Sequence, residues 1–134
     1  MTSTSGSQAF CLKLNSHQSH MIDSFQRLYN DELMFDCTIS CTGGTLKAHK
    51  LVLSACSPYF TNLFTNFTNP FQYPIVVIKD MPFADLKAIV EFMYRGEVTV
   101  PQSILASVLE SAKTLSITGL SDIKVIYFYC STAV

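Results

Sequence analysis

The chain has 134 residues, of which 49% are hydrophobic and 14% are charged, and its formal net charge is -1. This length suffices for one domain with a sizeable core, but the charged share is well below the usual quarter, so we expect a partner to cover part of the apolar surface. Because the sequence has no basic stripe, its composition excludes binding to nucleic acid by phosphate neutralisation.

The cysteine spacing matches no metal-binding pattern, and Met1–Gln8 has neither the charge nor the apolar run of a secretory signal. We therefore expect reduced thiols in a nuclear or cytosolic protein. The apolar run Val125–Cys130 is too short to cross a membrane, so no membrane association is expected. The cysteines are Cys11, Cys37, Cys41, Cys56 and Cys130.

Residues 1–9 are polar and predict a disordered leader. Phe10, Leu12 and Leu14 then alternate with a cysteine and a lysine, which predicts a strand with one apolar face. No hairpin partner adjoins this strand, so its backbone must find hydrogen bonds elsewhere. A helix capped by Asn15-Ser16 is expected next. Its apolar face consists of Met21, Ile22, Phe25, Leu28 and Tyr29.

A hairpin and two short helices are predicted in the next part of the chain. The strand Phe35–Cys41 turns at Gly43-Gly44 and returns over residues 45–48. In the helical stretch after it, Ser57 can cap free N–H groups, and Pro58 at the first helical position loses no hydrogen bond. One face of the second helix carries Phe60, Leu63, Phe64 and Phe67.

After a loop containing Asn69-Pro70, the run Ile75–Ile78 is entirely β-branched and predicts a strand buried on both faces. Pro82 opens a helix that ends at Arg95-Gly96. Val98–Val100 follows as a short strand. The inward residues of the helix are Leu86, Ile89, Val90 and Met93.

Pro101 opens a further helix that we expect to end at Gly119. Its inward face carries Ile104, Leu105, Val108, Leu109, Ala112 and Leu115. Residues 120–125 fit another helix, whereas residues 126–130 have the composition of a strand. This order of elements predicts an α+β or α/β fold with a small sheet capped by helices.

The pattern resembles the BTB/POZ domain, a protein–protein assembly module, over residues 10–123. It leaves residues 1–9 as the leader and residues 124–134 as a divergent tail. The segments that carry the resemblance are Phe35–Ile39, Leu46–Phe60, Ile75–Asp80, Phe92–Val98 and Ser116–Leu120.

The segment Phe10–Ser19 resembles the N-terminal motif of the tramtrack-type group of insect BTB domains, with Leu14 where that group has Trp and Ser16 where it has Asn. In the fold that the chain resembles, the first strand is exchanged in a dimer and pairs beside the short strand of the second copy. The first helix packs against its symmetry mate. The resemblance thus implies an interface made by Phe10, Leu12, Leu14, Met21, Ile22, Phe25, Val98 and Val100.

The tramtrack-type group occurs in nuclear transcription and chromatin regulators of RNA polymerase II genes. The resemblance therefore implies an oligomerisation domain in the nucleus, with the cytoplasm as the alternative. Its expected partners are itself, as a dimer or higher oligomer, related BTB domains, and corepressor or architectural proteins. The alternative function is a substrate adaptor for a cullin-based ubiquitin ligase. The face for that partner would be Tyr59, Phe60, Leu63 and Phe64.

Each of the remaining polar residues that could form a functional site has two possible interpretations. Asp36 and Lys50 match a charged pocket near the dimer groove in related domains, or they form a structural ion pair. His49 is either a hydrogen-bonded structural residue or a titrating or metal-binding group. The cysteines fit small core residues, and no nucleophile with its base is found, so we expect no enzyme, metal or cofactor.

Overall fold

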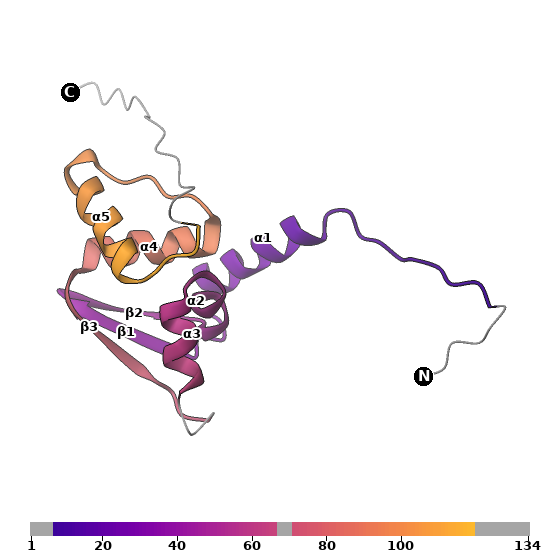
Figure 1. Cartoon of the computed structure of the whole chain (residues 1–134), viewed down its shortest axis with the longest axis horizontal. Coiled ribbons are helices and arrows are strands. Elements are labelled where there is room, and N and C mark those ends of the chain that lie inside the picture. Colours follow the sequence, from indigo (N-terminus) through magenta and orange to yellow (C-terminus); the bar gives the residue numbers. More distant parts are fainter. Residues whose placement is uncertain (1–6, 67–70, 120–134) are drawn as a thin grey trace.

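The computed structural model describes residues 7–66 and 71–119. Within these ranges the chain forms an α+β fold in which helices pack against one face of a small sheet (Figure 1). The elements in order are α1 (His17–Asn30), β1 (Cys37–Thr42), β2 (Gly44–Ala48), α2 (Lys50–Cys56), α3 (Pro58–Thr65), β3 (Ile75–Pro82), α4 (Phe83–Arg95) and α5 (Gln102–Thr114).

The sheet of the described chain has the strand order β2-β1-β3. Strands β1 and β2 form the predicted antiparallel hairpin, which turns at Gly43 with a φ of 94°. Strand β3 returns after the two helices and runs parallel to β1, with Ile39 opposite Val76. Because side chains alternate across a strand, Ile39 and Val76 both face the core, and both are buried.

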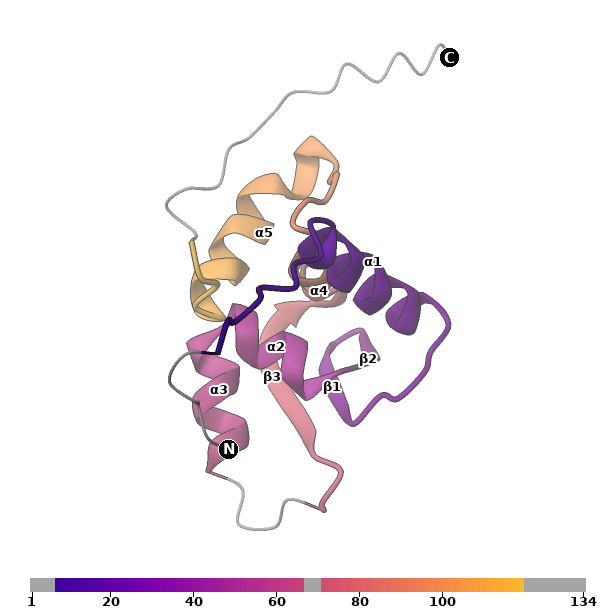
Figure 2. The same cartoon turned by 90° about the vertical axis from the view of Figure 1, so that its right-hand side faces the viewer.

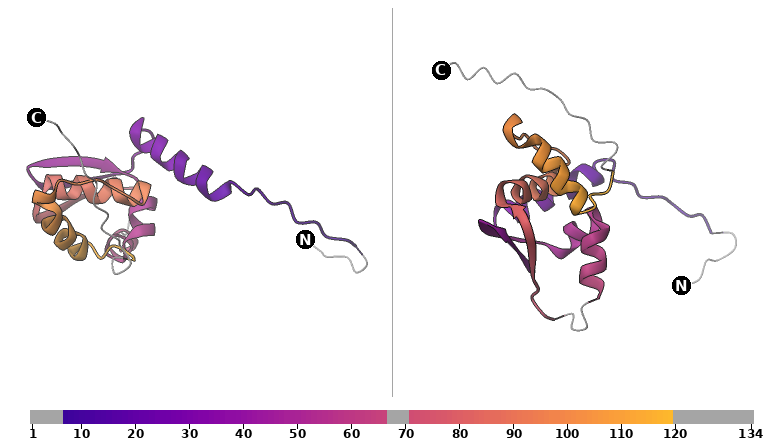
Figure 3. Two further views of the ribbon diagram at one scale, coloured as in Figure 1. Left: turned by 90° about the horizontal axis from the view of Figure 1, so that it is seen from above. Right: turned by 60° about the vertical axis from the view of Figure 1, so that its left-hand side comes forward.

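The helices lie on one side of the sheet, so the core fills the space between them and the inner sheet face (Figures 1 and 3). Helices α2 and α3 pack against each other, as do α4 and α5. The largest fully buried side chains are Phe60, Ile39, Leu53, Leu86, Leu115 and Val90.

The predicted helix ends at Ser57 and Gly96 are confirmed. The Ser57 hydroxyl oxygen accepts a hydrogen bond from the Phe60 N–H at 3.3 Å, and Pro58 occupies the first turn of α3. The same hydroxyl donates to the Leu115 carbonyl oxygen at 2.5 Å, which links α3 to the end of α5. Gly96 ends α4 in the left-handed conformation, with a φ of 80°.

The prediction that the Ile75–Ile78 strand is buried on both faces is wrong. Ile75 and Val77 are 66% and 73% exposed, whereas Val76 and Ile78 are buried. The reason is that β3 is an edge strand and the helices cover only one face of the sheet. The run of β-branched residues therefore indicates a strand here, but it does not indicate that both faces of the strand are buried.

Two short predicted strands and one helix end also differ from the structure. Residues 10–14 and 98–100 are not in strands within the single chain, because neither segment has a strand beside it to pair with. Helix α5 ends at Thr114 rather than at Gly119, because the chain turns there and the Thr118 N–H donates to the Cys56 carbonyl oxygen at 2.9 Å. Phe67, Asn69-Pro70 and residues 120–134 lie outside the described residues.

Candidate functional site

The predicted interface residues of the leader are all exposed. Phe10, Leu12 and Leu14 are 82%, 96% and 62% exposed, and the leader runs away from the body of the molecule (Figure 1). Residues 10–13 form no hydrogen bond to the rest of the described chain. An extended, apolar segment with free backbone groups is therefore available to pair with another strand.

Helix α1 carries apolar side chains in two directions. Phe25 and Tyr29 pack against the core, whereas Met21 and Ile22 are 40% and 45% exposed. No residue of α1 is buried, and the helix projects past α4, on which it packs (Figure 2). The outer face of α1 thus continues the apolar surface that begins in the leader.

Val98 and Val100 lie at a different part of the molecule, between α4 and α5. Both are half-buried against the core, and Thr99 between them is exposed. Residues 98–100 also form no backbone hydrogen bond within the described chain. The single chain therefore does not bring these valines together with the leader.

Asp36 and Lys50 are brought together, but through the backbone of Lys50. The Asp36 Oδ1 atom accepts a hydrogen bond from the Lys50 N–H at 2.7 Å. Lys50 is the first residue of α2, so this carboxylate caps one of the free N–H groups at the start of that helix. Both residues are half-buried at the junction of β1 and α2.

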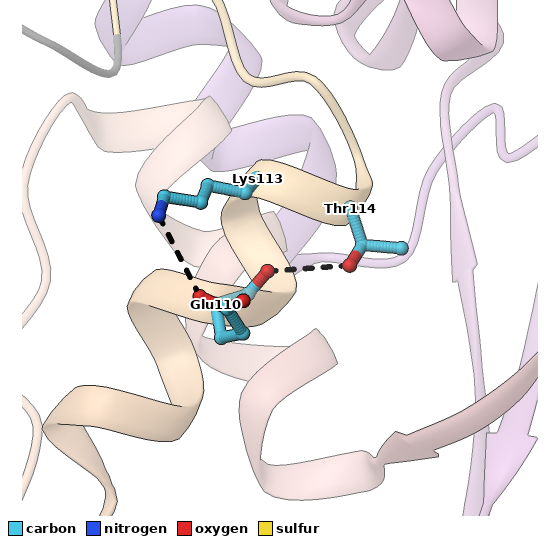
Figure 4. A network of polar contacts seen from close by, with 3 residues as sticks. All are labelled: Glu110, Lys113 and Thr114. Carbon is cyan, nitrogen blue, oxygen red and sulfur yellow. Dashed lines mark hydrogen bonds and ion pairs between the residues drawn. The ribbon is translucent and has the colours of Figure 1, made fainter.

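The described residues contain no ion pair between the two side chains of Asp36 and Lys50. The ion pair that they do contain joins Lys113 Nζ to Glu110 Oε2 at 3.7 Å on α5 (Figure 4). The side chains of both residues in this pair are exposed, and the Thr114 hydroxyl donates to the Glu110 carbonyl oxygen beside them. Such surface pairs contribute little to stability.

The face expected for a cullin-type partner is only partly accessible. Tyr59 is 37% exposed, and Leu63 and Phe64 are half-buried. Phe60, in contrast, is fully buried and stacks on Phe64, so its assignment to a partner face is wrong. Its ring is part of the core because α3 begins at Pro58, and this start directs the helix face that carries Phe60 inward. The adaptor function stays a prediction.

His49 has hydrogen bonds at both ring nitrogens, to Tyr94 and to the Leu33 carbonyl oxygen. No group of three or more His, Cys, Asp or Glu residues in the described segments is arranged to hold a metal ion. Among the cysteines, Cys37 is fully buried and donates to the Ala48 carbonyl oxygen at 3.4 Å. Burial raises the pKa of the Cys37 thiol to about 12, so this cysteine is not a nucleophile near neutral pH.

Comparison with known proteins decides the family. The model of the BTB/POZ domain matches residues 25–131. The chain belongs to the BTB/POZ family. Solved structures agree with this fold: the BTB domain of zebrafish PATZ1 matches with a TM-score of 0.72 at 19% sequence identity, over 85% of this chain and 92% of that one.

Curated relatives of this BTB/POZ chain come from Drosophila melanogaster. It is 48% identical to protein bric-a-brac 2 over 116 residues and 48% identical to the alpha isoform of protein tramtrack over 117 residues, which in each case is 87% of the chain. A Broad-complex core protein is 44% identical over 115 residues, or 86% of the chain. The aligned part spans only 11%, 14% and 16% of these three relatives. The resemblance to the tramtrack-type group is thereby confirmed.

BTB domains are interaction domains rather than enzymes, so the surfaces of this BTB/POZ chain are the features that bear on its function. One such surface was missed in the sequence. The outward side of β3 and of the residues before it is apolar, and its exposed members are Phe71, Tyr73, Ile75 and Val77. The signal that could have revealed it is the apolar residue at every second position from 71 to 77. Within residues 7–66 and 71–119, no helix combines the length and hydropathy needed to cross a bilayer.

Proposed function

We propose that this chain is the self-association domain of a nuclear transcription or chromatin regulator, and that it acts by assembling copies and recruiting cofactors. The observation that carries the proposal is the exposed apolar leader, in which Phe10 and Leu12 are more than four-fifths exposed. Apolar side chains in a segment with unpaired backbone groups favour a second protein chain as the partner.

The leader has a complementary site in a second copy. We infer that residues 10–14 of one copy pair with residues 98–100 of the other, because residues 10–13 and 98–100 form no backbone hydrogen bonds within the described part of the chain. Edge-to-edge pairing would satisfy these groups. Met21 and Ile22, exposed on α1, would then meet the α1 helix of the second copy around a two-fold axis.

The energetics support a stable dimer. Burial of one large apolar side chain contributes about 1.5–3 kcal/mol, and Phe10, Leu12, Leu14, Met21 and Ile22 are exposed in the single chain. Each is present twice in a symmetric dimer. Because some of these side chains are only partly exposed, the gain from their burial is of the same order as an association cost of about 4–15 kcal/mol.

The regulatory role rests on the relatives and on multivalency. The chain is 48% identical to the alpha isoform of tramtrack over 117 residues, yet the aligned part spans only 14% of that protein. An assembly domain that links copies of a longer regulator raises the effective concentration of whatever the other domains bind. Related BTB domains and corepressor or architectural proteins are the partners that this role requires.

Assembly beyond the dimer belongs to the same proposal. The outward face of β3 is apolar and lies at the free edge of the sheet, away from the leader and α1. This face is available to a second dimer after the first interface has formed. A substitution on this face can therefore separate its contribution from that of the leader and α1.

The decisive experiment measures the mass of the chain in solution by light scattering at micromolar concentration. The full chain is expected to be a dimer or larger, and a chain lacking residues 1–16 to dissociate, aggregate or unfold. A chain lacking only residues 1–9 is the matched control, because it keeps Phe10, Leu12 and Leu14 and should assemble like the full chain. A well-folded monomeric full chain would refute the proposal.

A further inference from the structure

We infer that the His49 imidazole is a positioning residue for self-association, because it fixes the direction in which α1 leaves the body of the domain. This inference rests on the proposed function, in which α1 carries part of the dimer interface. Helix α1 has no buried residue and projects from the domain, so its direction depends on few contacts (Figures 1 and 2). His49 lies where those contacts meet.

The connection begins at the end of α1. The Leu33 N–H donates to the Leu28 carbonyl oxygen at 2.9 Å, which ties Leu33 to the last turn of the helix. The Leu33 carbonyl oxygen accepts from His49 Nε2 at 2.7 Å. A single residue, Leu33, therefore joins the end of α1 to the residue that precedes α2.

The turn around Leu33 is strained and needs this support. Glu32 and Met34, on either side of Leu33, have φ values of 55° and 63°, although neither is glycine. A left-handed residue of this kind costs about 1–2 kcal/mol. The conformation persists only when its surroundings hold it, and the hydrogen bond from His49 acts on the carbonyl group of Leu33, the residue between the two strained ones.

The imidazole is itself oriented by Tyr94 on α4. The Tyr94 hydroxyl accepts a hydrogen bond from the His49 backbone N–H at 2.9 Å and lies 2.5 Å from His49 Nδ1. A carbonyl oxygen can only accept, so Nε2 carries the proton towards Leu33, and Nδ1 accepts from the Tyr94 hydroxyl. This arrangement selects one tautomer and one ring orientation.

Tyr94 also contacts α1 directly, through the ring of Tyr29. The rings of Tyr29 and Tyr94 have their centroids 4.4 Å apart, and Phe35 contacts both Tyr29 and His49. Tyr94 is 2% exposed, so it is a fixed part of the core. The path from the core to α1 is therefore Tyr94, then His49, then the Leu33 peptide.

Two substitutions of similar polarity separate this role from a general structural one. His49→Gln places an amide N–H near the position of Nε2 and can still donate to Leu33, whereas His49→Asn reaches only the position of Nδ1. Val108→Ala removes buried side-chain volume in α5, away from α1, and serves as a control for lost stability. Each full-length variant is measured for its thermal midpoint, its dimer dissociation constant, and amide hydrogen exchange in α1 and residues 31–35.

We expect His49→Asn to weaken self-association at least tenfold and to raise exchange in α1 and residues 31–35. His49→Gln should retain most of both properties, and Val108→Ala should lower the midpoint without a specific change in α1. Equal behaviour of the Asn and Gln variants in exchange would overturn the inference. Ile22→Asp tests the proposed function separately: if it leaves assembly unchanged, α1 is not the interface, while the exchange data still decide the role of His49.

Discussion

At the residue scale, several side chains act through backbone groups of neighbouring elements. Asp36 caps the first turn of α2 through the Lys50 N–H, and Ser57 both caps α3 and donates to the Leu115 carbonyl oxygen. Short polar side chains with a backbone partner lose little conformational entropy and satisfy groups that a helix end leaves free. The contribution of Asp36 therefore does not depend on the charge of Lys50.

Substitutions at Asp36 and Lys50 should therefore have unequal effects. Asp36→Ala is expected to lower the free energy of unfolding by about 1–2 kcal/mol, because it leaves the Lys50 N–H without its acceptor. Asp36→Asn keeps an acceptor oxygen and should lose less, and Lys50→Ala should change stability by no more than about 0.5 kcal/mol. Denaturant unfolding at one fixed protein concentration measures all three. A loss for Lys50→Ala equal to that for Asp36→Ala would instead establish an ion pair.

Alkaline pH should destabilise the fold through its buried thiol and phenol groups. Burial raises the pKa of Cys37 from an ordinary 9.0 to about 12, and burial also raises the pKa of Tyr94. Between pH 9 and pH 12 the folded state keeps the Cys37 proton that the unfolded state releases, so this contribution to stability is complete below pH 9 and is lost above it. The unfolding free energy should fall over that range, and less steeply in Cys37→Ala. Identical slopes for both proteins would contradict this expectation.

At the element scale, the β1–β2 hairpin is fitted closely against the start of α4. A Cβ atom added at Gly44 would lie 2.6 Å from Cδ1 of the Phe83 ring, the first residue of that helix. The absence of a side chain at Gly44 thus lets the hairpin and α4 approach each other. Gly43 beside it has a different role, because its φ of 94° is needed for the turn.

Gly44→Ala is accordingly expected to destabilise the domain by about 1–3 kcal/mol, since the added methyl group overpacks the contact with Phe83. Thr45→Ala, at the next and exposed position of β2, is the control and should be nearly neutral. Thermal unfolding compares the two variants. The loss caused by Gly44→Ala should be smaller in a Phe83→Ala background than in the unmodified chain, and an equal loss in both backgrounds would exclude the proposed clash.

At the scale of the whole molecule, the low charge content is accompanied by much apolar surface, and three parts of it bear on assembly. They are the leader, the outer face of α1 and the outward face of β3, whose exposed members are Phe10, Leu12, Leu14, Met21, Ile22, Phe71, Tyr73, Ile75 and Val77. The first two are continuous along the chain, whereas the third lies at the edge of the sheet. A dimer that uses the first two would still leave the third exposed.

Val77→Lys should therefore reduce the size of the assembly to a dimer without lowering the thermal midpoint, because Val77 is 73% exposed and its removal opens no cavity. Thr45→Lys is the matched control, since it adds the same charge to an exposed position at the opposite edge of the sheet. Sedimentation velocity distinguishes the assemblies. If both variants keep the size of the unmodified chain, the β3 face takes no part in assembly.

Local pattern was enough to predict most of the described elements. The caps at Ser57 and Gly96, the hairpin at Gly43-Gly44 and the inward face of α4 are set by residues close together in the chain, so periodicity and turn chemistry reveal them. The apolar leader was likewise visible as an alternating segment without a neighbouring strand. For the caps, the hairpin and α4 the sequence determined both the element and the face that it presents, whereas for the leader it determined only the apolar pattern.

Other features depended on contacts between distant segments. The exposure of Val77, the burial of Phe60 and the end of α5 at Thr114 follow from which face of the sheet is covered and where the chain turns back. The hydrogen bond between the Asp36 carboxylate and the Lys50 backbone N–H could not be predicted from the sequence for the same reason. Sequence alone determined the elements and the apolar segments, because these depend on neighbours along the chain; only the tertiary structure decided which surfaces stay exposed, because that depends on packing between residues far apart in sequence.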